Sequence, residues 1–200
     1  MKIYAIYIVS CAEPYTNEGS IISNYTDFPR KFMLHSGTIT ETCRFLSKTL
    51  AVYCQPGTQT SAEHEGMLLN VFHRADHLIC VVFTDFDYPK RVSFILCARV
   101  IEQFSGTFAN AWVNVPKDTD MKFKDLKKIA KEFEHPDQHD AIQRALVATS
   151  QTTEIITQAL NKIIIRGETL QDLVEKSEEL SAKAKIFYKE SKKKKCCEIF

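Results

Sequence analysis

The sequence has no long hydrophobic run, no cysteine pattern typical of a zinc site and no motif typical of a nucleotide site. Its longest uninterrupted apolar run is Ile3–Val9, much shorter than the roughly twenty residues of a membrane-spanning helix. It has no C-x-x-C pair, and its seven cysteines are irregularly spaced, so neither a zinc site nor a disulfide framework is predicted. The P-loop and G-x-G-x-x-G patterns are missing too. We therefore expect no segment that crosses a bilayer, no cofactor and a reducing compartment.

The sequence also lacks an excess of charge of one sign. Lysine and arginine total 26 residues, aspartate and glutamate 25, and the net charge is +1. Since a nucleic-acid-binding domain presents a strong basic field, no nucleic-acid partner is expected. The tetrapeptide Ile8-Val9-Ser10-Cys11 is similar to a lipoprotein cleavage box, but only Lys2 precedes its short apolar stretch. A first β-strand is therefore the favoured interpretation.

The first two thirds of the chain alternate between strand-like and helix-like patterns. Runs of β-branched and aromatic residues between turn residues predict strands, and apolar residues at three- and four-residue steps predict helices. The expected strands are 2–10, 21–25, 67–73 and 78–83, and the expected helices are 40–52, 91–104 and 124–133. This order, with two or three strands between the first two helices, indicates an α/β (α+β) domain with an antiparallel sheet.

The character of the sequence changes between about Asp140 and Lys195. This stretch has no proline and a single glycine, Gly167, and its apolar residues form a narrow heptad seam. A long helix with so thin an apolar stripe needs partner helices to bury it. The seam positions are Ile142, Ala145, Thr149, Thr152, Ile156, Ala159, Ile163, Arg166, Leu170, Leu173, Ser177, Leu180, Ala184 and Phe187.

One seam position holds a full charge, Arg166, between Ile163 and Leu170. A buried guanidinium without acceptors costs several kcal/mol. Two interpretations stay open: either partner helices bring neutral oxygen acceptors to this layer, or Arg166 lies on the solvated side of a surface helix. In the first case, a polar seam residue also fixes the register and the number of helices.

The C-terminus carries signals for lipid attachment. Cys197 is fourth from the end, as in a prenylation signal, and the terminal Phe200 favours geranylgeranyl over farnesyl. A single lipid chain holds a protein to a membrane only reversibly, and two further signals are present. Cys196 can be acylated, and Lys192–Lys195 attract the anionic cytoplasmic membrane surface.

Together, these features resemble the longin-type R-SNAREs of the synaptobrevin family, in the prenylated, lipid-anchored branch without a transmembrane helix. The resemblance covers the whole chain. In the first part it rests on Met1-Lys2-Ile3-Tyr4 and on the string from Asp87 to Phe94 with Val100, Ile101 and Phe104. In the second part it rests on the strings 165–170, 172–174, 176–178 and 187–189.

The resemblance implies a longin (profilin-like) domain over 1–135, with a five-stranded antiparallel sheet between helices. A long SNARE coiled-coil helix with its linker would span 136–190, and a polybasic prenylation tail 191–200. The longin domain would fold back on the SNARE helix, restrain it and shield the lipid. Candidate residues for that groove are Cys43, Leu46 and Leu50.

The resemblance also implies roles for residues in the second part. Arg166 would be the ionic layer, facing glutamines from three partner SNARE helices, and Cys197 would carry a prenyl group and Cys196 a palmitoyl or second prenyl group. The protein would drive fusion of vesicles with their targets on ER–Golgi, Golgi and endosomal or vacuolar routes. It would lie in the cytoplasm and on cytoplasmic membrane faces and be recycled by the SNARE disassembly machinery. The packing layers would be Ile156, Ala159, Ile163, Leu170, Leu173, Ser177, Leu180, Ala184 and Phe187.

Two rival functions differ in class. In the first, the protein is a lipid-anchored longin adaptor or tether whose helix only spaces it from the membrane. The second is an enzyme built on His135, Asp137 and His139, which have the spacing of metal ligands. A polar linker explains these residues at least as well, and no base-and-nucleophile pattern accompanies them. We therefore expect no enzymatic activity.

Overall fold

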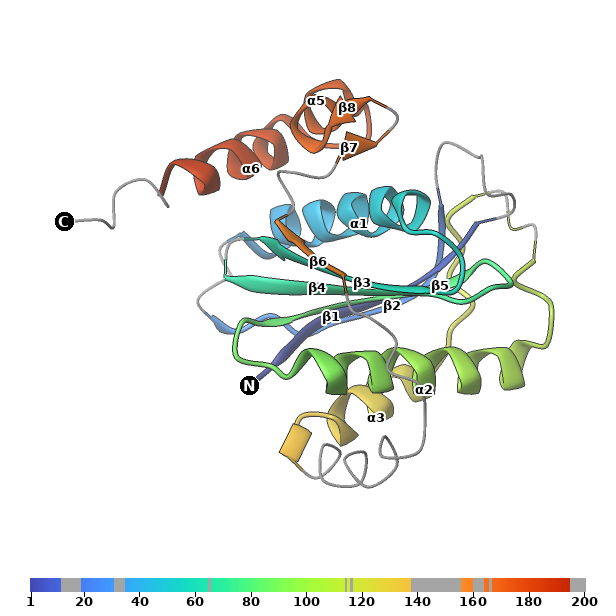
Figure 1. The fold of residues 1–200 in the computed structure, drawn as a ribbon. Coiled ribbons are helices and arrows are strands. Elements are labelled where there is room, and N and C mark those ends of the chain that lie inside the picture. Colours follow the sequence, from blue (N-terminus) through green and yellow to red (C-terminus); the bar gives the residue numbers. More distant parts are fainter. Residues whose placement is uncertain are drawn as a thin grey trace.

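The computed structural model describes residues 1–11, 19–30, 35–64, 66–113, 115, 117–137, 156–159, 164–165 and 167–194. A central sheet has helix α1 (Ser36–Tyr53) on one face and helices α2 (Lys90–Phe108) and α3 (Asp125–Glu132) on the other (Figure 1). The C-terminal helices α5 (Leu170–Lys176) and α6 (Ala182–Lys194) lie on the α1 side. None of the helices in the described residues is both long and apolar enough to cross a membrane.

Five antiparallel strands form the sheet, and this prediction from the resemblance is confirmed. The spatial order is β2-β1-β5-β4-β3, and a short sixth strand, β6 (Ile156–Ala159), pairs parallel with β3. The five strands are β1 (Ile3–Ser10), β2 (Ser20–Thr26), β3 (Thr58–His64), β4 (Met67–His73) and β5 (Leu78–Asp85).

Alternation along the strands builds two separate cores. Successive side chains of a strand point to opposite faces of the sheet, and every residue of β1 is buried. Tyr7 and Val9 therefore join the cluster under α1, whereas Ile6 and Ile8 join the cluster under α2 and α3. The residues of β1 are apolar on both faces for this reason, which explains why its sequence is a continuous apolar run.

The expected elements of the first 135 residues are found, with ends shifted by a few residues. The structure also contains one strand that the sequence pattern does not locate, β3. Its residues, from Thr58 to His64, are mostly small or polar, so they lack the alternating large apolar residues by which a strand is recognised.

The C-terminal segment, expected as one long helix, is divided in this structure. Gly167 has a positive φ of 83° and makes the turn between two short strands, β7 (Ile164–Ile165) and β8 (Glu168–Thr169). A capping box between Thr169 and Asp172 then starts α5. The hydrogen bond from the Thr169 hydroxyl holds the pKa of Asp172 below its usual value.

The division has a physical reason in the packing of this segment. The chain leaves helical geometry at Ser177, whose ψ is 126°, and resumes it at α6. The break allows apolar side chains of both α5 and α6 to join the cluster under α1. The seam residues Ile142, Ala145, Thr149, Thr152, Ile163 and Arg166, and the terminal Cys196 and Cys197, lie outside the described residues.

Candidate functional site

The site is the contact between α1 and the C-terminal segment, residues 164–194. On α1, apolar residues recur along one face, and the groove candidates Cys43, Leu46 and Leu50 are each at most 1% exposed. They share one apolar cluster with residues of α5 and α6. The structure therefore brings together the groove candidates and several predicted packing layers, although their roles stay predictions.

The predicted packing layers are buried to different degrees. Leu170, Leu180 and Ala184 are buried in the α1 cluster. Leu173 and Phe187 pack against it and are partly buried, and Ser177 is half-buried. Ile156 and Ala159 lie in β6, on the edge of the sheet beside β3. Three apolar residues that a helix bundle would bury, Leu170, Leu180 and Ala184, are thus covered by the first domain.

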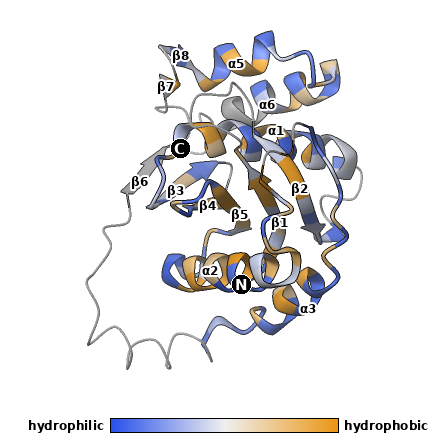
Figure 2. Ribbon diagram, turned by 90° about the vertical axis from the view of Figure 1, so that its right-hand side faces the viewer, coloured by the Kyte–Doolittle hydropathy of each residue, from blue (hydrophilic) through white to orange (hydrophobic). Residues whose placement is uncertain are grey.

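Two buried residues of the contact lie outside the predicted heptad seam. Val174 and Tyr188 are each 1% exposed, yet each follows a seam residue by one position and is not itself in the seam. The signal that could have found them is helical spacing, since Val174 lies four residues after Leu170 and Tyr188 four residues after Ala184. The face of α5 and α6 that joins the α1 cluster therefore includes these two positions beside the buried seam residues. Figure 2 shows hydrophobic and hydrophilic residues along α5.

Aromatic contacts fix α6 at two places. The ring of Tyr188 stacks on the ring of His64, at the end of β3, with 5.1 Å between centroids and an interplanar angle of 20°. The ring of Phe187 lies 6.0 Å from that of His35, the residue that precedes α1. Because the two contacts lie on different elements of the first domain, they set the direction of α6 as well as its position.

Charged groups surround the apolar contact. Lys48 on α1 is nearly buried, and its Nζ lies 2.7 Å from Oε1 of Glu179 and 3.6 Å from Oδ1 of Asp118. Asp118 also accepts a hydrogen bond of 2.6 Å from Arg44. Closer to the start of α6, the backbone and hydroxyl of Ser181 both donate to the carboxylate of Glu41.

We expect Glu179→Lys to loosen the contact, because two ammonium groups would then face each other. An ion pair with one exposed partner contributes about 1 kcal/mol, so the population of released segment should rise roughly fivefold. Hydrogen exchange of the α6 amides measures that population. Glu178→Lys is the matched control, since it changes the charge equally and Glu178 makes no ion pair among the described residues. Equal exchange in both variants would contradict a role for the Lys48–Glu179 pair.

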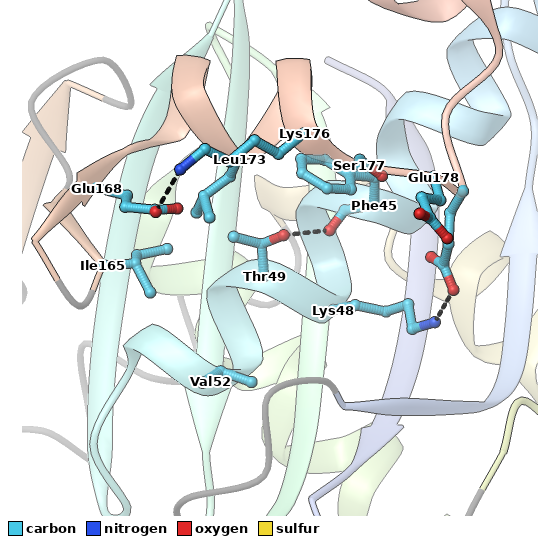
Figure 3. A pocket seen from close by; sticks show the side chains of 11 residues that line it. Phe45, Lys48, Thr49, Val52, Ile165, Glu168, Leu173, Lys176, Ser177 and Glu178 are labelled. Atoms are coloured by element: carbon cyan, nitrogen blue, oxygen red, sulfur yellow. Dashed lines mark hydrogen bonds and ion pairs between the residues drawn. The ribbon is translucent and has the colours of Figure 1, made fainter.

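A cavity of about 750 Å³ lies between α1 and α5 (Figure 3). Phe45, Val52, Ile165 and Leu173 give it an apolar wall. Its rim is charged, with an ion pair of 2.6 Å between Lys176 and Glu168. Its other lining residues are Lys48, Thr49, Ser177, Glu178 and Glu179. This composition suits an apolar ligand with a polar end and offers no set of groups for catalysis.

The described cysteines are poor nucleophiles. Cys11, Cys43, Cys54, Cys80 and Cys97 are free and buried, and burial raises the pKa of Cys11 and Cys54 to about 11. In the metal candidate, His135 and Asp137 are exposed and His139 lies outside the described residues. Within the described ranges, no group of three potential ligands converges.

We expect alkylation of the folded, unlipidated protein at pH 8 to modify Cys196 and Cys197 and to spare the five buried thiols. A thiol with a pKa near 11 is deprotonated at pH 8 in roughly one molecule in a thousand, and burial also blocks the reagent. Iodoacetamide labelling followed by peptide mass spectrometry reads each site. Denatured protein is the control and should react at all seven positions. Fast native labelling of any of the five would contradict the described burial.

The two parts that meet at the site each match a family model. The synaptobrevin model matches residues 141–197, and the longin model, a regulated-SNARE-like domain, matches residues 31–130. Over 200 residues, all of both chains, the sequence is 29% identical to VAMP-like protein YKT61 of Arabidopsis thaliana. It is 31% identical over 202 residues to Synaptobrevin homolog YKT6 of Yarrowia lipolytica, and 26% over 199 residues to that of Saccharomyces cerevisiae, each with 98% of both chains covered.

Proposed function

This chain belongs to the synaptobrevin family of R-SNAREs, which act in vesicle fusion, and we propose that its longin domain keeps the SNARE segment in a closed state until partner SNAREs replace it. The observation that carries the proposal concerns Leu170, Leu180 and Ala184. These side chains lie in the seam predicted to pack against partner helices, and in this structure they are buried in the α1 cluster. A side chain cannot fill two cores at once, so the closed state and the assembled bundle exclude each other.

In the assembled state, residues 136–190 would form one helix with three glutamine-bearing SNARE helices. Arg166 would lie in the central layer and satisfy its donors with glutamine oxygens, which adds no second charge to the core. The other seam residues would pack as layers on either side. Zipping toward the C-terminal anchor would draw the two membranes together, and the disassembly machinery would later free the chain.

Lipid attachment would hold the protein to the cytoplasmic face of Golgi, vesicle or endosomal membranes. Cys197 would carry the prenyl group and Cys196 the second lipid, with Lys192–Lys195 adding attraction to anionic lipid. The cavity between α1 and α5 supports a further step, because its apolar wall suits a prenyl chain. A closed molecule could thus cover its own lipid and remain in the cytoplasm.

Circular dichroism of the full chain mixed with three glutamine-bearing SNARE helices tests the proposal. In the closed state only 170–176 and 182–194 are helical within the described part of the segment. We therefore expect the mixture to contain more helix than the sum of its components, because assembly converts the turns and short strands into helix. A signal equal to that sum, in a mixture where the partners assemble with another R-SNARE, would contradict the proposal.

A further inference from the structure

Helix α3 carries a row of lysines on the side of the molecule opposite the SNARE segment. Its apolar residues Leu126, Ile129 and Ala130 are buried in the cluster under α2, so its other face points away from the fold. Five lysines on and just before this helix are all exposed: Lys122, Lys124, Lys127, Lys128 and Lys131. Figure 1 shows α3 below α2, with α5 and α6 beyond the far face of the sheet.

The lysines of this surface share one face, and acidic residues lie at its edges. Residues 120–134 contain these five lysines and four acids, Asp120, Asp125, Glu132 and Glu134. Helical spacing places Lys124, Lys127, Lys128 and Lys131 on the face opposite the buried residues of α3, and Asp125 and Glu132 at the edges of that face. Within the described residues, none of the five makes an ion pair. Lys48, by contrast, lies between two carboxylates. The α3 lysines are thus available to an external anion.

The chemistry of the row favours a broad anionic surface over a small ligand. All five cations are lysines, which act as hydrated point charges, whereas arginine provides the fixed fork that recognises a single carboxylate or phosphate. None of the five lines the cavity between α1 and α5. We infer that the lysine face of α3 docks the longin domain onto a bilayer that contains anionic lipid.

The docking would be electrostatic and shallow. The apolar side of α3 is already buried against α2, so the helix cannot insert into the acyl region as a free amphipathic helix does. Attraction between lysines and an anionic leaflet falls off within a Debye length, which shrinks from about 10 Å at 0.1 M salt to about 3 Å at 1 M. Binding should therefore vanish at high ionic strength.

The arrangement of layers gives this docking a direction. Because α3 and α6 lie on opposite sides of the sheet, a domain held by α3 presents α1 and the SNARE segment to the cytosol. This consequence rests on the proposed function, since only a SNARE segment gains by facing its partners. The contact between α3 and lipid does not depend on it.

Co-sedimentation of the full, unlipidated chain with vesicles tests the inference. Vesicles of phosphatidylcholine with phosphatidylserine are compared with phosphatidylcholine alone, at low and high salt. The variant replaces Lys124, Lys127, Lys128 and Lys131 by glutamine. The matched control replaces Lys192–Lys195 by glutamine, which removes the same charge from the other end of the chain. Circular dichroism confirms that each variant is folded.

We expect wild-type protein to bind the anionic vesicles only, and the α3 variant to bind at least tenfold more weakly. The tail variant should keep the part of the vesicle binding that α3 provides. A variant that combines the α3 and the tail substitutions should not bind the vesicles. The inference is wrong if the α3 variant binds as wild type does. It is also wrong if the wild type ignores vesicles but binds polyglutamate, which would make the partner an acidic protein. Neither outcome alters assembly with SNARE helices, which is measured without lipid.

Discussion

Replacing Tyr188 with alanine should release the SNARE segment from the longin domain and speed its assembly with partner SNAREs at least tenfold. The ring of Tyr188 is 1% exposed and stacks on His64. Truncating a buried aromatic side chain costs about 3 kcal/mol or more, which corresponds to roughly a hundredfold change in the ratio of open to closed molecules. Since only open molecules can zip, the apparent assembly rate rises with their fraction.

The stability of the assembled bundle should hardly change in this variant, because Tyr188 follows the seam residue Phe187 and does not itself lie in the seam. Ile186→Ala is the matched control on the same helix, since Ile186 is 54% exposed and should alter neither state. Leu180→Ala should affect both states, unlike Tyr188→Ala, because Leu180 is buried in the closed state and is also a predicted packing layer. This substitution should speed opening of the closed state and lower the stability of the assembled bundle.

Stopped-flow fluorescence of labelled partner helices measures these assembly rates, and thermal melting measures the stability of the bundles. If Tyr188→Ala assembles at the wild-type rate, the longin contact does not restrain the SNARE segment. If it melts several degrees below wild type once assembled, Tyr188 belongs to the bundle core and the assignment of the two faces is wrong.

Replacing Arg166 with alanine should lower the stability of the assembled complex by about 3 kcal/mol. In the proposed central layer, the guanidinium satisfies three buried glutamine side chains. Removing it leaves amide groups without partners, at about 1–3 kcal/mol for each unsatisfied group, together with a cavity. Thermal melting of the purified complex measures the loss.

Lys176→Ala is the control for Arg166, since Lys176 is a cation of the same segment with an exposed side chain that pairs only with Glu168 among the described residues. It should change the melting temperature little. A swap tests the layer further. Arg166→Gln in this chain, combined with replacement of one partner's layer glutamine by arginine, restores the composition of one arginine and three glutamines. The complex should then regain much of the stability lost in Arg166→Ala. A complex that melts unchanged after Arg166→Ala would favour the tether, in which the helix is only a spacer.

Sequence patterns located the elements of the longin core other than β3, because the pattern of each of those elements has a local cause. The continuous apolar run of β1 and the helical spacing in α1 and α2 follow from which face each residue buries, and both faces of the sheet are covered within the chain. The groove candidates Cys43, Leu46 and Leu50 were found for the same reason. They follow the helical spacing of the buried face of α1, which also contains Ile39.

The closed arrangement of the segment could not be predicted in this way. A heptad seam specifies that a face must be buried and does not specify the partner, so the pattern of Leu170 to Phe187 suits a bundle and the α1 groove equally well. Val174 and Tyr188 distinguish the two states. Each lies four residues after a buried seam residue, Leu170 or Ala184, so helical spacing marks them and the heptad register does not. The ion pair between Lys48 and Glu179 joins residues 131 positions apart in the sequence, and nothing local to either residue indicates it.

The most direct test of the account is the distance between α1 and α6 before and after assembly. Ser36 and Lys183, both exposed, would each be replaced by cysteine in a chain whose Cys196 and Cys197 are changed to serine. The two new cysteines would carry spin labels, and the buried thiols should remain unlabelled. We expect one short distance in the free chain, because α1 and α6 share a core, and a long, broad distribution in the complex with three glutamine-bearing SNARE helices. A short distance that persists in the fully assembled complex would contradict it, since the SNARE segment would then be paired without leaving the longin domain.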